Sequence, residues 1–432
     1  MRSNSAVVIG AGVIGGSVAL ALARAGIPIT ILDRAPGPGL GSTSASSAIV
    51  RFHYSTYQGV AVSWEAKHGW EDWPAHLGTT DPAGMARYIQ TGTLVLDTPG
   101  YDAGRVLAHY DRIGIPYEVL SAAEIRARFP YLSPDRFYPP RAVTDEEFWA
   151  PPDGEIGGFY CPQGGFVDDP GLAAHNLWAA ATAAGASSVF RAEVAEVRSD
   201  DGAVSGVTLV DGRRLDASIV VNAAGPHSAA INALAGVLGD FALSTRPLRQ
   251  EVHSVGGPAE LAGELGPSVG DSDLGTYYRF APGGSLLVGS QEPDCDPLEW
   301  LEHADDNDVR PTVAGFERQT LRLARRMPSV GVPNRPVGHA GVYDVTEDWI
   351  PIYDKTGVPG YFVAIGTSGN QFKNAPVVGQ LVTALITDWL DGGDHDTSPV
   401  SWTAPRTGAV VDLSHYSRLR APNADSSNSV LG

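Results

Sequence analysis

The first hydrophobic segment of the chain predicts a strand, a glycine-rich turn, a helix and a second strand. Ala6–Ile9 is a short apolar run typical of a buried strand, and an Ala/Leu-rich helical stretch follows and ends near Ala25, with Gly26 as its C-terminal cap. A second apolar run, Ile29–Leu32, ends at Asp33. This order is that of a βαβ unit in a parallel sheet.

Two further groups of strands interrupt that pattern and indicate a second domain. The first group has strands at Thr93–Leu96 and Gly158–Cys161, with a helix at Ala122–Arg128. The βαβ-type pattern then resumes with a helix at Pro170–Ala184, strands at Val189–Val197 and Ala203–Leu209, and an apolar run at Ser218–Val221. The second group has alternating strands at Leu248–Val255, Thr276–Phe280 and Ser285–Gly289. A buried strand at Tyr361–Ile365 and a helix through about Leu390 return to the first domain.

The pattern therefore predicts two interleaved domains. We expect an α/β nucleotide-binding domain of Rossmann type from residues 1–90, 166–240 and 337–400. A substrate domain of α+β type, with a mostly antiparallel sheet, is expected from residues 91–165 and 241–336. Residues 403–432 read as a polar tail that is disordered or loosely packed.

The first turn carries the residues that bind a dinucleotide. Gly10 permits the sharp turn, Gly12 lets the backbone approach a pyrophosphate, and Gly15 lets the helix pack close to the sheet. The helix N-terminus then offers free N–H groups to the phosphates. Asp33, 21 residues after Gly12, can accept hydrogen bonds from a ribose hydroxyl, and its charge disfavours NADP.

The second glycine-rich turn distinguishes FAD from NAD. An NAD-dependent dehydrogenase normally keeps its nucleotide half contiguous, whereas this chain interrupts the domain twice and returns with the strand-to-helix turn Gly366–Gly369. Such a turn can cradle another part of a long cofactor. FAD is therefore favoured, and an NAD-dependent dehydrogenase remains the alternative.

Composition narrows the possible partners. The 432 residues carry a formal charge of −19, which argues against nucleic acid or an anionic membrane surface as partner. The two cysteines, Cys161 and Cys295, match neither a disulfide framework nor a metal motif. The first residues lack the apolar region of a signal peptide and no apolar run reaches membrane-spanning length, so we expect neither a signal peptide nor a membrane span. We expect a cytoplasmic enzyme, a monomer or small homo-oligomer, without metal. Only three lysines occur, and one of them, Lys373, lies in the second glycine-rich turn.

Several motifs, taken in order, resemble the D-amino-acid-oxidase-like flavoprotein family. They are Val7–Gly16, Gly41–Ser46, Leu120–Ile125, Val220–Gly225 and Gly366–Pro376. Within the family the chain looks most like monomeric sarcosine oxidase and glycine oxidase. The resemblance implies a non-contiguous FAD domain and a substrate domain whose large sheet covers the flavin. The expected FAD-binding residues are Gly10, Gly12, Val13, Ile14, Gly15, Asp33, Arg34, Ser42, Thr43, Ser44, Val194, Ala224, Gly225, Gly366, Gly369, Asn370, Gln371, Phe372 and Lys373.

The resemblance also implies a substrate site. Arg51 and Lys373 match an arginine and a lysine that clamp the substrate carboxylate, one with two parallel donors and the other as a point charge. Tyr343, together with Tyr277 or Tyr278, matches active-site tyrosines. His53 is a candidate for taking the amine proton with a near-neutral pKa. The alternatives are a surface ion pair for Arg51, a charge on a helix surface for Lys373, core packing for the tyrosines and a structural role for the histidine.

Two positions depart from the family pattern. Gly341 stands where sarcosine oxidase has the cysteine bonded to its flavin, so FAD is expected to be non-covalent. Leu287 stands where the family has a lysine that activates oxygen by stabilising negative charge. His53 or Arg279 could replace that lysine, or the electrons could go to an acceptor other than oxygen.

The sequence thus predicts an FAD-dependent enzyme that oxidises the C–N bond of an amino acid or N-alkyl amino acid. Hydride transfer to flavin would give an imine that is hydrolysed or released, and molecular oxygen, giving hydrogen peroxide, or another acceptor would reoxidise the flavin. A flavin dehydrogenase or biosynthetic flavoenzyme acting on a carboxylate-bearing amine is the nearest alternative. A flavin hydroxylase and a non-catalytic flavin-binding protein are more distant ones.

Overall fold

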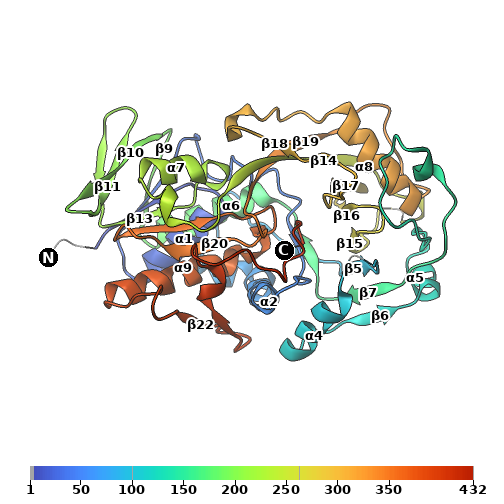
Figure 1. Cartoon of the computed structure of the whole chain (residues 1–432), viewed down its shortest axis with the longest axis horizontal. Coiled ribbons are helices and arrows are strands. Elements are labelled where there is room, and N and C mark those ends of the chain that lie inside the picture. Colours follow the sequence, from blue (N-terminus) through green and yellow to red (C-terminus); the bar gives the residue numbers. More distant parts are fainter. Residues whose placement is uncertain (1–3, 100, 262, 432) are drawn as a thin grey trace.

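The computed structural model describes residues 4–99, 101–261 and 263–431, so residues 1–3 of the first expected range and residue 432 of the last lie outside it. Figure 1 shows two halves, with the nucleotide-type sheet and its helices in one and the large mixed sheet in the other. The C-terminal segment ends between the two halves (Figure 1). The fold is of the mixed α/β class that the sequence predicts.

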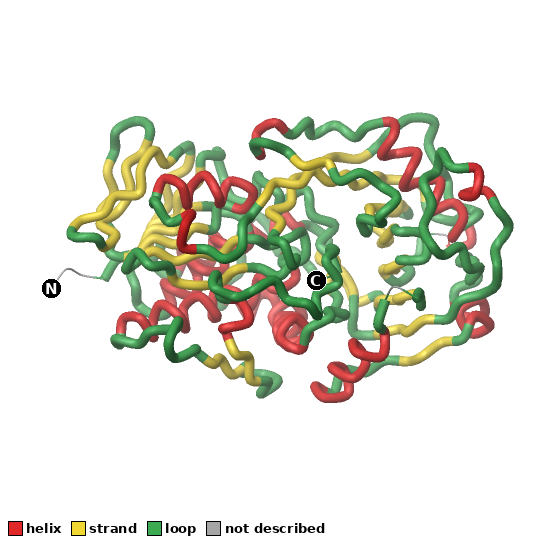
Figure 2. Tube along the Cα trace, in the orientation of Figure 1, coloured by secondary structure: helices red, strands yellow, loops and turns green. Residues whose placement is uncertain are grey.

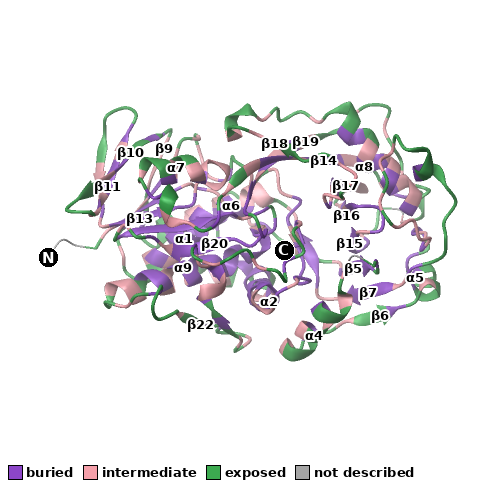
Figure 3. Ribbon diagram, in the orientation of Figure 1, coloured by how far each residue is buried: buried purple, intermediate pink, exposed green. Residues whose placement is uncertain are grey.

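The sheet of the first half has the strand order β20-β21-β13-β1-β2-β9. Its strands are β1 (Ala6–Ile9), β2 (Ile29–Asp33), β9 (Ser187–Phe190), β13 (Ile219–Asn222), β20 (Ile352–Lys355) and β21 (Tyr361–Ile365). All neighbours are parallel except β20, which runs antiparallel to β21. Every residue of β1 and β13 is buried, as expected of central parallel strands that are covered on both faces (Figure 3 colours buried segments purple).

Helices cover the sheet of the first half. They are α1 (Val13–Arg24), α2 (Tyr57–Glu71), α3 (Trp73–Leu77), α6 (Pro170–Ala183), α7 (Ser228–Leu234) and α9 (Ala375–Leu390). Helix α1 packs against both α6 and α9, and Ser17 of α1 hydrogen-bonds the α9 backbone on both sides, accepting from Gly379 N and donating to Ala375 O. Residues from the two ends of the chain therefore form one core.

The large sheet belongs to the second half and is mostly antiparallel, as predicted. Its order is β18-β14-β17-β16-β15-β5-β7-β6, and β19 pairs with β14. Its strands are β5 (Thr93–Leu96), β6 (Glu118–Leu120), β7 (Gly158–Cys161), β14 (Arg246–Gly256), β15 (Ser268–Asp271), β16 (Thr276–Ala281), β17 (Ser285–Ser290), β18 (Glu299–Trp300) and β19 (Gly338–Val345). Helices α4 (Ala103–Ile113), α5 (Ala122–Arg128) and α8 (Val313–Arg326) accompany it.

Smaller sheets complete the chain, and Figure 2 traces their strands among the loops. They are β3 (Ile49–Val50) with β8 (Gly165–Val167) and β4 (Tyr88–Gln90), then β10 (Val194–Asp200) with β11 (Ala203–Leu209) and β12 (Arg214–Asp216), and β22 (Ser401–Thr403) with β23 (Val410–Asp412).

Two expectations differ from the structure. The expected first domain resumes at residue 337, yet β19 pairs with β14 along Arg246–His253 and so extends the large sheet. The expected single strand Val189–Val197 is two strands, β9 and β10, separated by Arg191 with φ +53°. The sequence does not indicate the turn between β9 and β10, because no glycine occupies the position with positive φ.

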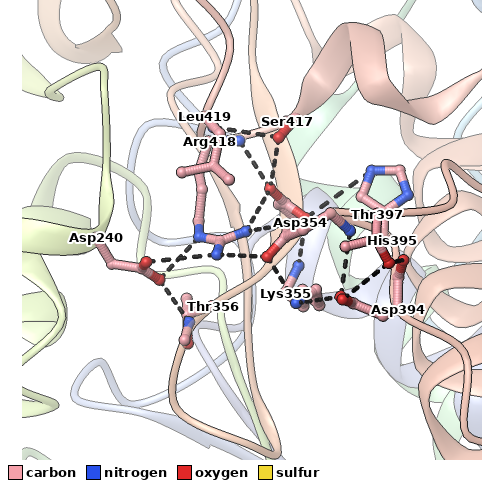
Figure 4. Close-up of polar contacts among 12 residues, drawn as sticks. Asp240, Asp354, Lys355, Thr356, Asp394, His395, Thr397, Ser417, Arg418 and Leu419 are labelled. Atoms are coloured by element: carbon pink, nitrogen blue, oxygen red, sulfur yellow. Dashed lines mark hydrogen bonds and ion pairs between the residues drawn. The ribbon is translucent and has the colours of Figure 1, made fainter.

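The C-terminal segment is folded, which corrects the expectation of a loosely packed tail. Arg418 is 2% exposed, and its guanidinium bonds the carboxylates of Asp240, Asp354 and Asp396 (Figure 4 labels the first two). Arg420 adds a pair with the buried Asp348 at 2.9 Å. These ion pairs, made with distant parts of the chain, hold a polar stretch that has little apolar surface of its own.

Candidate active site

A cavity of about 1300 Å³ lies between the two sheets and is lined by residues of both. Pockets for drug-sized ligands usually enclose about 300–1,000 Å³. The cavity begins at the β1–α1 turn and extends past Asp33 to the large sheet, where Tyr277 and Tyr343 line it. It therefore has room for a dinucleotide together with a small substrate.

The β1–α1 turn has the shape that a pyrophosphate requires. Gly10 has φ +111°, and a Cβ there would lie 2.3 Å from the carbonyl oxygen of Ala223. A Cβ on Gly15 would lie 1.9 Å from the Gly10 oxygen, so the glycine is what allows α1 to start directly against the strand. Gly12 has no side chain to cap the helix, and Thr43 Oγ1 accepts a hydrogen bond only from Val13 N, at 3.2 Å, so further N–H groups of the first turn are left for an anion.

Asp33 is held in a fixed orientation at the end of β2. Its Oδ2 accepts a hydrogen bond from Ala11 N at 2.7 Å, and its Oδ1 accepts one from Ala35 N at 2.8 Å. Each oxygen keeps a lone pair for a ribose hydroxyl. Arg34, beside it, is 45% exposed and paired with Asp305 at the mouth of the cavity.

Most of the residues expected to bind FAD line this cavity. They are Gly10, Gly12, Val13, Ile14, Asp33, Arg34, Ser42, Thr43, Ser44, Val194, Ala224, Gly225, Gly369, Gln371, Phe372 and Lys373. Gly15, Gly366 and Asn370 do not line it. They support the wall instead, since Gly366 has φ +66° in the β21 turn and Asn370 donates to Trp349 O at 3.1 Å.

The two expected carboxylate-binding cations come together in the wall. Arg51 and Lys373 lie near the same aromatic ring, with the Arg51 Cζ 4.9 Å and the Lys373 Nζ 5.2 Å from the centroid of Tyr54. Both are buried, at 8% and 4% exposed. Among the described residues, no carboxylate is ion-paired with either. The surface roles considered as alternatives therefore do not describe them.

Neutral oxygens occupy the donors of both cations. Arg51 donates to the carbonyl oxygens of His53 at 2.8 Å and of Val430 at 2.5 Å. Lys373 donates to Asn370 O at 2.6 Å and to the hydroxyl of Tyr54 at 3.0 Å. Burial, with the nearby Arg51 charge, lowers the pKa of Lys373 well below its usual value. A bound anion would offset the effects of burial and of the Arg51 charge on this pKa, because it would attract the charged form of Lys373.

His53 is buried between these groups, and the expected near-neutral pKa is wrong. Burial lowers its pKa well below the usual value, and the charges of Arg51 and Lys373 lower it further. Its Nδ1 is buried without a hydrogen-bond partner among the described residues. His53 is therefore a neutral imidazole near pH 7 and a weak base for an ammonium proton.

Tyr277 and Tyr343 line the cavity with aromatic rings that carry hydroxyl groups. The Tyr277 hydroxyl lies 3.0 Å from Ser47 Oγ, and burial raises the pKa of both tyrosines, so both are neutral phenols. The Tyr343 ring lies against Gly369, where a Cβ would come within 2.3 Å of it. Tyr278, the other candidate, is fully buried in the core of the large sheet and does not line the cavity.

The departures from the family pattern also have a structural setting. Gly341 lines the cavity, whereas Cys161 and Cys295 do not. Leu287 lies in β17 and does not line the cavity. Arg279, considered as a replacement cation, donates to Ser47 O at 2.5 Å and Phe280 O at 3.1 Å and does not line the cavity.

Some lining residues were not expected from the sequence. Gln250, Gln291 and His339 face the cavity from the large sheet, and Val430 and Leu431 reach it from the C-terminal segment. Gln291 follows directly after β17, so a polar side chain at the end of a predicted strand is a signal that could have identified it. Within residues 4–99, 101–261 and 263–431, no group of acidic, histidine and cysteine side chains is arranged to hold a metal. None of the helices in these ranges has the length and apolar character needed to cross a bilayer.

Comparison with known proteins identifies the family and the fold of the chain. Glycine oxidase of Geobacillus kaustophilus (strain HTA426) is 25% identical over 386 residues, which cover 88% of this chain and 92% of that protein. Solved structures with the same fold include L-proline dehydrogenase from P. horikoshii (TM-score 0.75, 22% identity, 96% of this chain and 97% of the other). They also include glycine oxidase from Geobacillus kaustophilus (TM-score 0.72, 22% identity, 97% and 99%). Residues 5–385 match the family described as "DAO: FAD dependent oxidoreductase", with FAD as cofactor, and the chain belongs to this family.

Proposed function

We propose that this FAD-dependent oxidoreductase oxidises the C–N bond of an amino acid or N-alkyl amino acid that carries a free carboxylate. The single observation behind the proposal is the pair of buried cations, Arg51 and Lys373, that share the cavity with the dinucleotide site and have no acidic partner among the described residues. Buried charges are normally paired, so this pair favours an anionic ligand.

FAD bound at the β1–α1 turn would supply the two-electron acceptor. The chain itself would bind and orient the substrate. Arg51 can hold a carboxylate through two parallel donors, and Lys373 has a third donor beyond those bonded to Asn370 and Tyr54. Tyr277 and Tyr343 would close the opposite side with apolar rings and neutral hydroxyls.

The test is substrate-dependent flavin reduction without oxygen. We expect Arg51→Ala and Lys373→Ala to lose about 2–5 kcal/mol of transition-state or substrate binding, because each leaves a desolvated carboxylate short of a partner. Arg51→Lys should also lose activity, since a point charge does not reproduce the two-pronged contact. All variants should keep their FAD.

The deciding experiment measures flavin reduction by each amino acid substrate and by its decarboxylated analogue, in wild type and in each variant. The losses should be large for the acid and small for the analogue, which never uses the cations. Arg213→Ala, which removes an exposed arginine paired with Asp211, is the matched control. Equal losses on both compounds would count against the clamp.

We also propose an electron acceptor other than oxygen, because none of the three positions considered for an oxygen-activating cation places a free positive charge in the cavity. Leu287 replaces the expected lysine, His53 is neutral, and Arg279 is bonded to backbone carbonyls. Reduced enzyme mixed with oxygen should reoxidise much more slowly than enzyme mixed with a quinone. Faster reoxidation by oxygen would make the enzyme an oxidase.

A further inference from the structure

The C-terminal segment places one residue of the chain itself between the carboxylate-binding cations and a buried carboxylate. Val430 and Leu431 line the cavity at 8% and 7% exposed. The carbonyl oxygen of Val430 accepts a hydrogen bond from Arg51 Nη2 at 2.5 Å. On the other side, Val430 N donates to Glu292 Oε2 at 3.4 Å.

This arrangement has the chemical skeleton of an α-amino acid. The nitrogen, α-carbon and carbonyl group of Val430 follow one another as the amine, α-carbon and carboxyl group do in a free amino acid. The carbonyl oxygen of Val430 is hydrogen-bonded to Arg51, and its nitrogen is hydrogen-bonded to Glu292. The Val430 side chain lies in an apolar cluster with Leu248, Val345 and Trp349.

Glu292 has the features of a ligand-binding group. Its Oε1 is buried and has no hydrogen-bond partner among the described residues. Its φ of +51° is the left-handed conformation that residues other than glycine adopt rarely and that often marks functional positions. Glu292 does not itself line the cavity, since Val430 covers its Oε2.

We propose that Glu292 binds the amino group of the substrate, opposite Arg51, and receives its proton, and that the backbone of Val430 occupies the same position when no substrate is bound. This inference rests on the proposed function and makes it narrower. The substrate is an α-amino acid, primary or N-alkylated, with an apolar side chain that takes the place of the Val430 isopropyl group. The terminal segment must leave before the substrate enters.

The proton step is balanced within the pair. The ammonium nitrogen gives one proton to a carboxylate oxygen of Glu292, which leaves a neutral amine and a neutral carboxyl group, with no electrons transferred. The pKa of Glu292 is raised to about 8, mainly by burial, with the Val430 N–H acting to lower it and Asp296 adding a smaller raising effect. The other groups facing it are the neutral phenols of Tyr277 and Tyr343, and Arg51 lies beyond Val430. A base with such a pKa suits proton transfer near neutral pH.

The test compares ligands with and without nitrogen on the FAD-loaded full chain. The probes are L-valine, D-valine and N-methylvaline, with 3-methylbutanoate as the deaminated analogue. Apparent Kd values for the amino acids come from the saturation of anaerobic flavin reduction, and that for 3-methylbutanoate from the change in flavin absorbance. Glu292→Gln should weaken binding of the reactive valine probe by about 10- to 100-fold, the loss of one charged hydrogen bond. Below the pKa of Glu292, binding of 3-methylbutanoate should change less than about 2-fold in this variant, because 3-methylbutanoate has no amino group to bond to Glu292.

Two further measurements separate this role from a structural one. Arg51→Lys should weaken both classes of probe, and the exposed Glu302→Gln should weaken neither. In wild type, amino-acid binding should tighten as pH rises through the pKa of Glu292, because the carboxylate form attracts the ammonium group, and Glu292→Gln should lose this rise.

The results distinguish failure of the Glu292 assignment, of the apolar substrate class and of the proposed function. If valine reduces the wild-type flavin and Glu292→Gln weakens both probe classes equally or neither, Glu292 is not the amine-binding group. Reduction by polar amino acids but by none of the valine probes would overturn the apolar substrate class. A flavin that stays oxidised with every amino acid tested would contradict the proposed function itself.

Discussion

Replacing Arg418 by alanine should destabilise the whole enzyme, although the residue lies in a stretch that looks like a tail. Its guanidinium donates to Asp240 Oδ2 at 2.8 Å, to Asp396 Oδ1 at 2.7 Å and to Asp354 Oδ2 at 3.2 Å (Figure 4 shows Arg418 between Asp240 and Asp354). Alanine would leave the fully buried Asp354 without its cation.

The size of the effect follows from burial. Removing one partner of a fully buried ion pair costs about 3–5 kcal/mol. Asp240 and Asp396 are 26% and 21% exposed, and Asp354 keeps hydrogen bonds from Ser417 and from the Arg418 backbone, so we expect about 2–4 kcal/mol. With an unfolding entropy of about 2.1 cal/mol/K per residue over 432 residues, this lowers Tm by roughly 2–4 °C.

Thermal unfolding of the FAD-loaded protein, followed by circular dichroism, measures this change. Arg418→Lys should fall between wild type and Arg418→Ala, and Arg213→Ala, whose partner is exposed, should unfold within about 1 °C of wild type. Hydrogen bonds from Arg418 lower the pKa of Asp396, so this contribution is present above the unfolded pKa and is lost as pH falls through the folded one. The gap between wild type and Arg418→Ala should therefore narrow in acid. An Arg418→Ala protein with the wild-type Tm would show that the segment does not belong to the folded core.

Three other predictions concern the cofactor and substrate ends of the cavity. Gly12→Val should purify with little or no FAD, as judged by its visible spectrum, because the side chain would enter the space beside Thr43 where the pyrophosphate approaches, and full FAD occupancy would argue against this site. Acid precipitation should release all flavin as FAD, since neither cysteine lines the cavity; a yellow pellet would show a covalent link. The Kd for 3-methylbutanoate should rise as pH rises through the lowered pKa of Lys373, because only the charged amine attracts the carboxylate. In Lys373→Met the rise in Kd with pH should be smaller, and the part that remains should come from ionisation of Glu292, which the Glu292→Gln substitution removes. A pH profile of Kd unchanged from wild type in Lys373→Met would exclude Lys373 from the site.

The nucleotide half was predictable because local rules determine it. The steric needs of Gly10 and Gly15 are visible in a short stretch of sequence, and both glycines have the predicted close contacts. Helix α5 has the predicted bounds because Ser121 and Glu124 form a capping box at its start. Strands β5 and β7 also have the predicted bounds, because each apolar run ends at a turn signal.

The errors share a cause, which is pairing between segments far apart in the chain. Sequence order places β19 in the nucleotide half, because it follows the second group of strands, but its partner β14 lies more than 80 residues earlier. The tail was judged by its own composition, yet Asp240 and Asp354 supply the charges that bury Arg418. A polar stretch can fold when distant residues complete its hydrogen bonds, and no periodicity in the stretch itself reports them.

The same contrast explains which part of the substrate site the sequence could identify. Lys373 lies in a motif that carries the family resemblance, and Arg51 and Tyr343 match residues of the family, so all three could be named as candidates without a structure. Glu292 lies in no motif used for that resemblance, and the feature that singles it out is the backbone of Val430, 138 residues later, bonded to it and to Arg51. A site that combines Arg51, which matches a residue of the family, with Glu292, which does not lie in a family motif, would keep the general chemistry of the family and determine a separate substrate range. Substrate preference therefore has to be sought in the contacts between β17 and the terminal segment, where sequence motifs give no guidance.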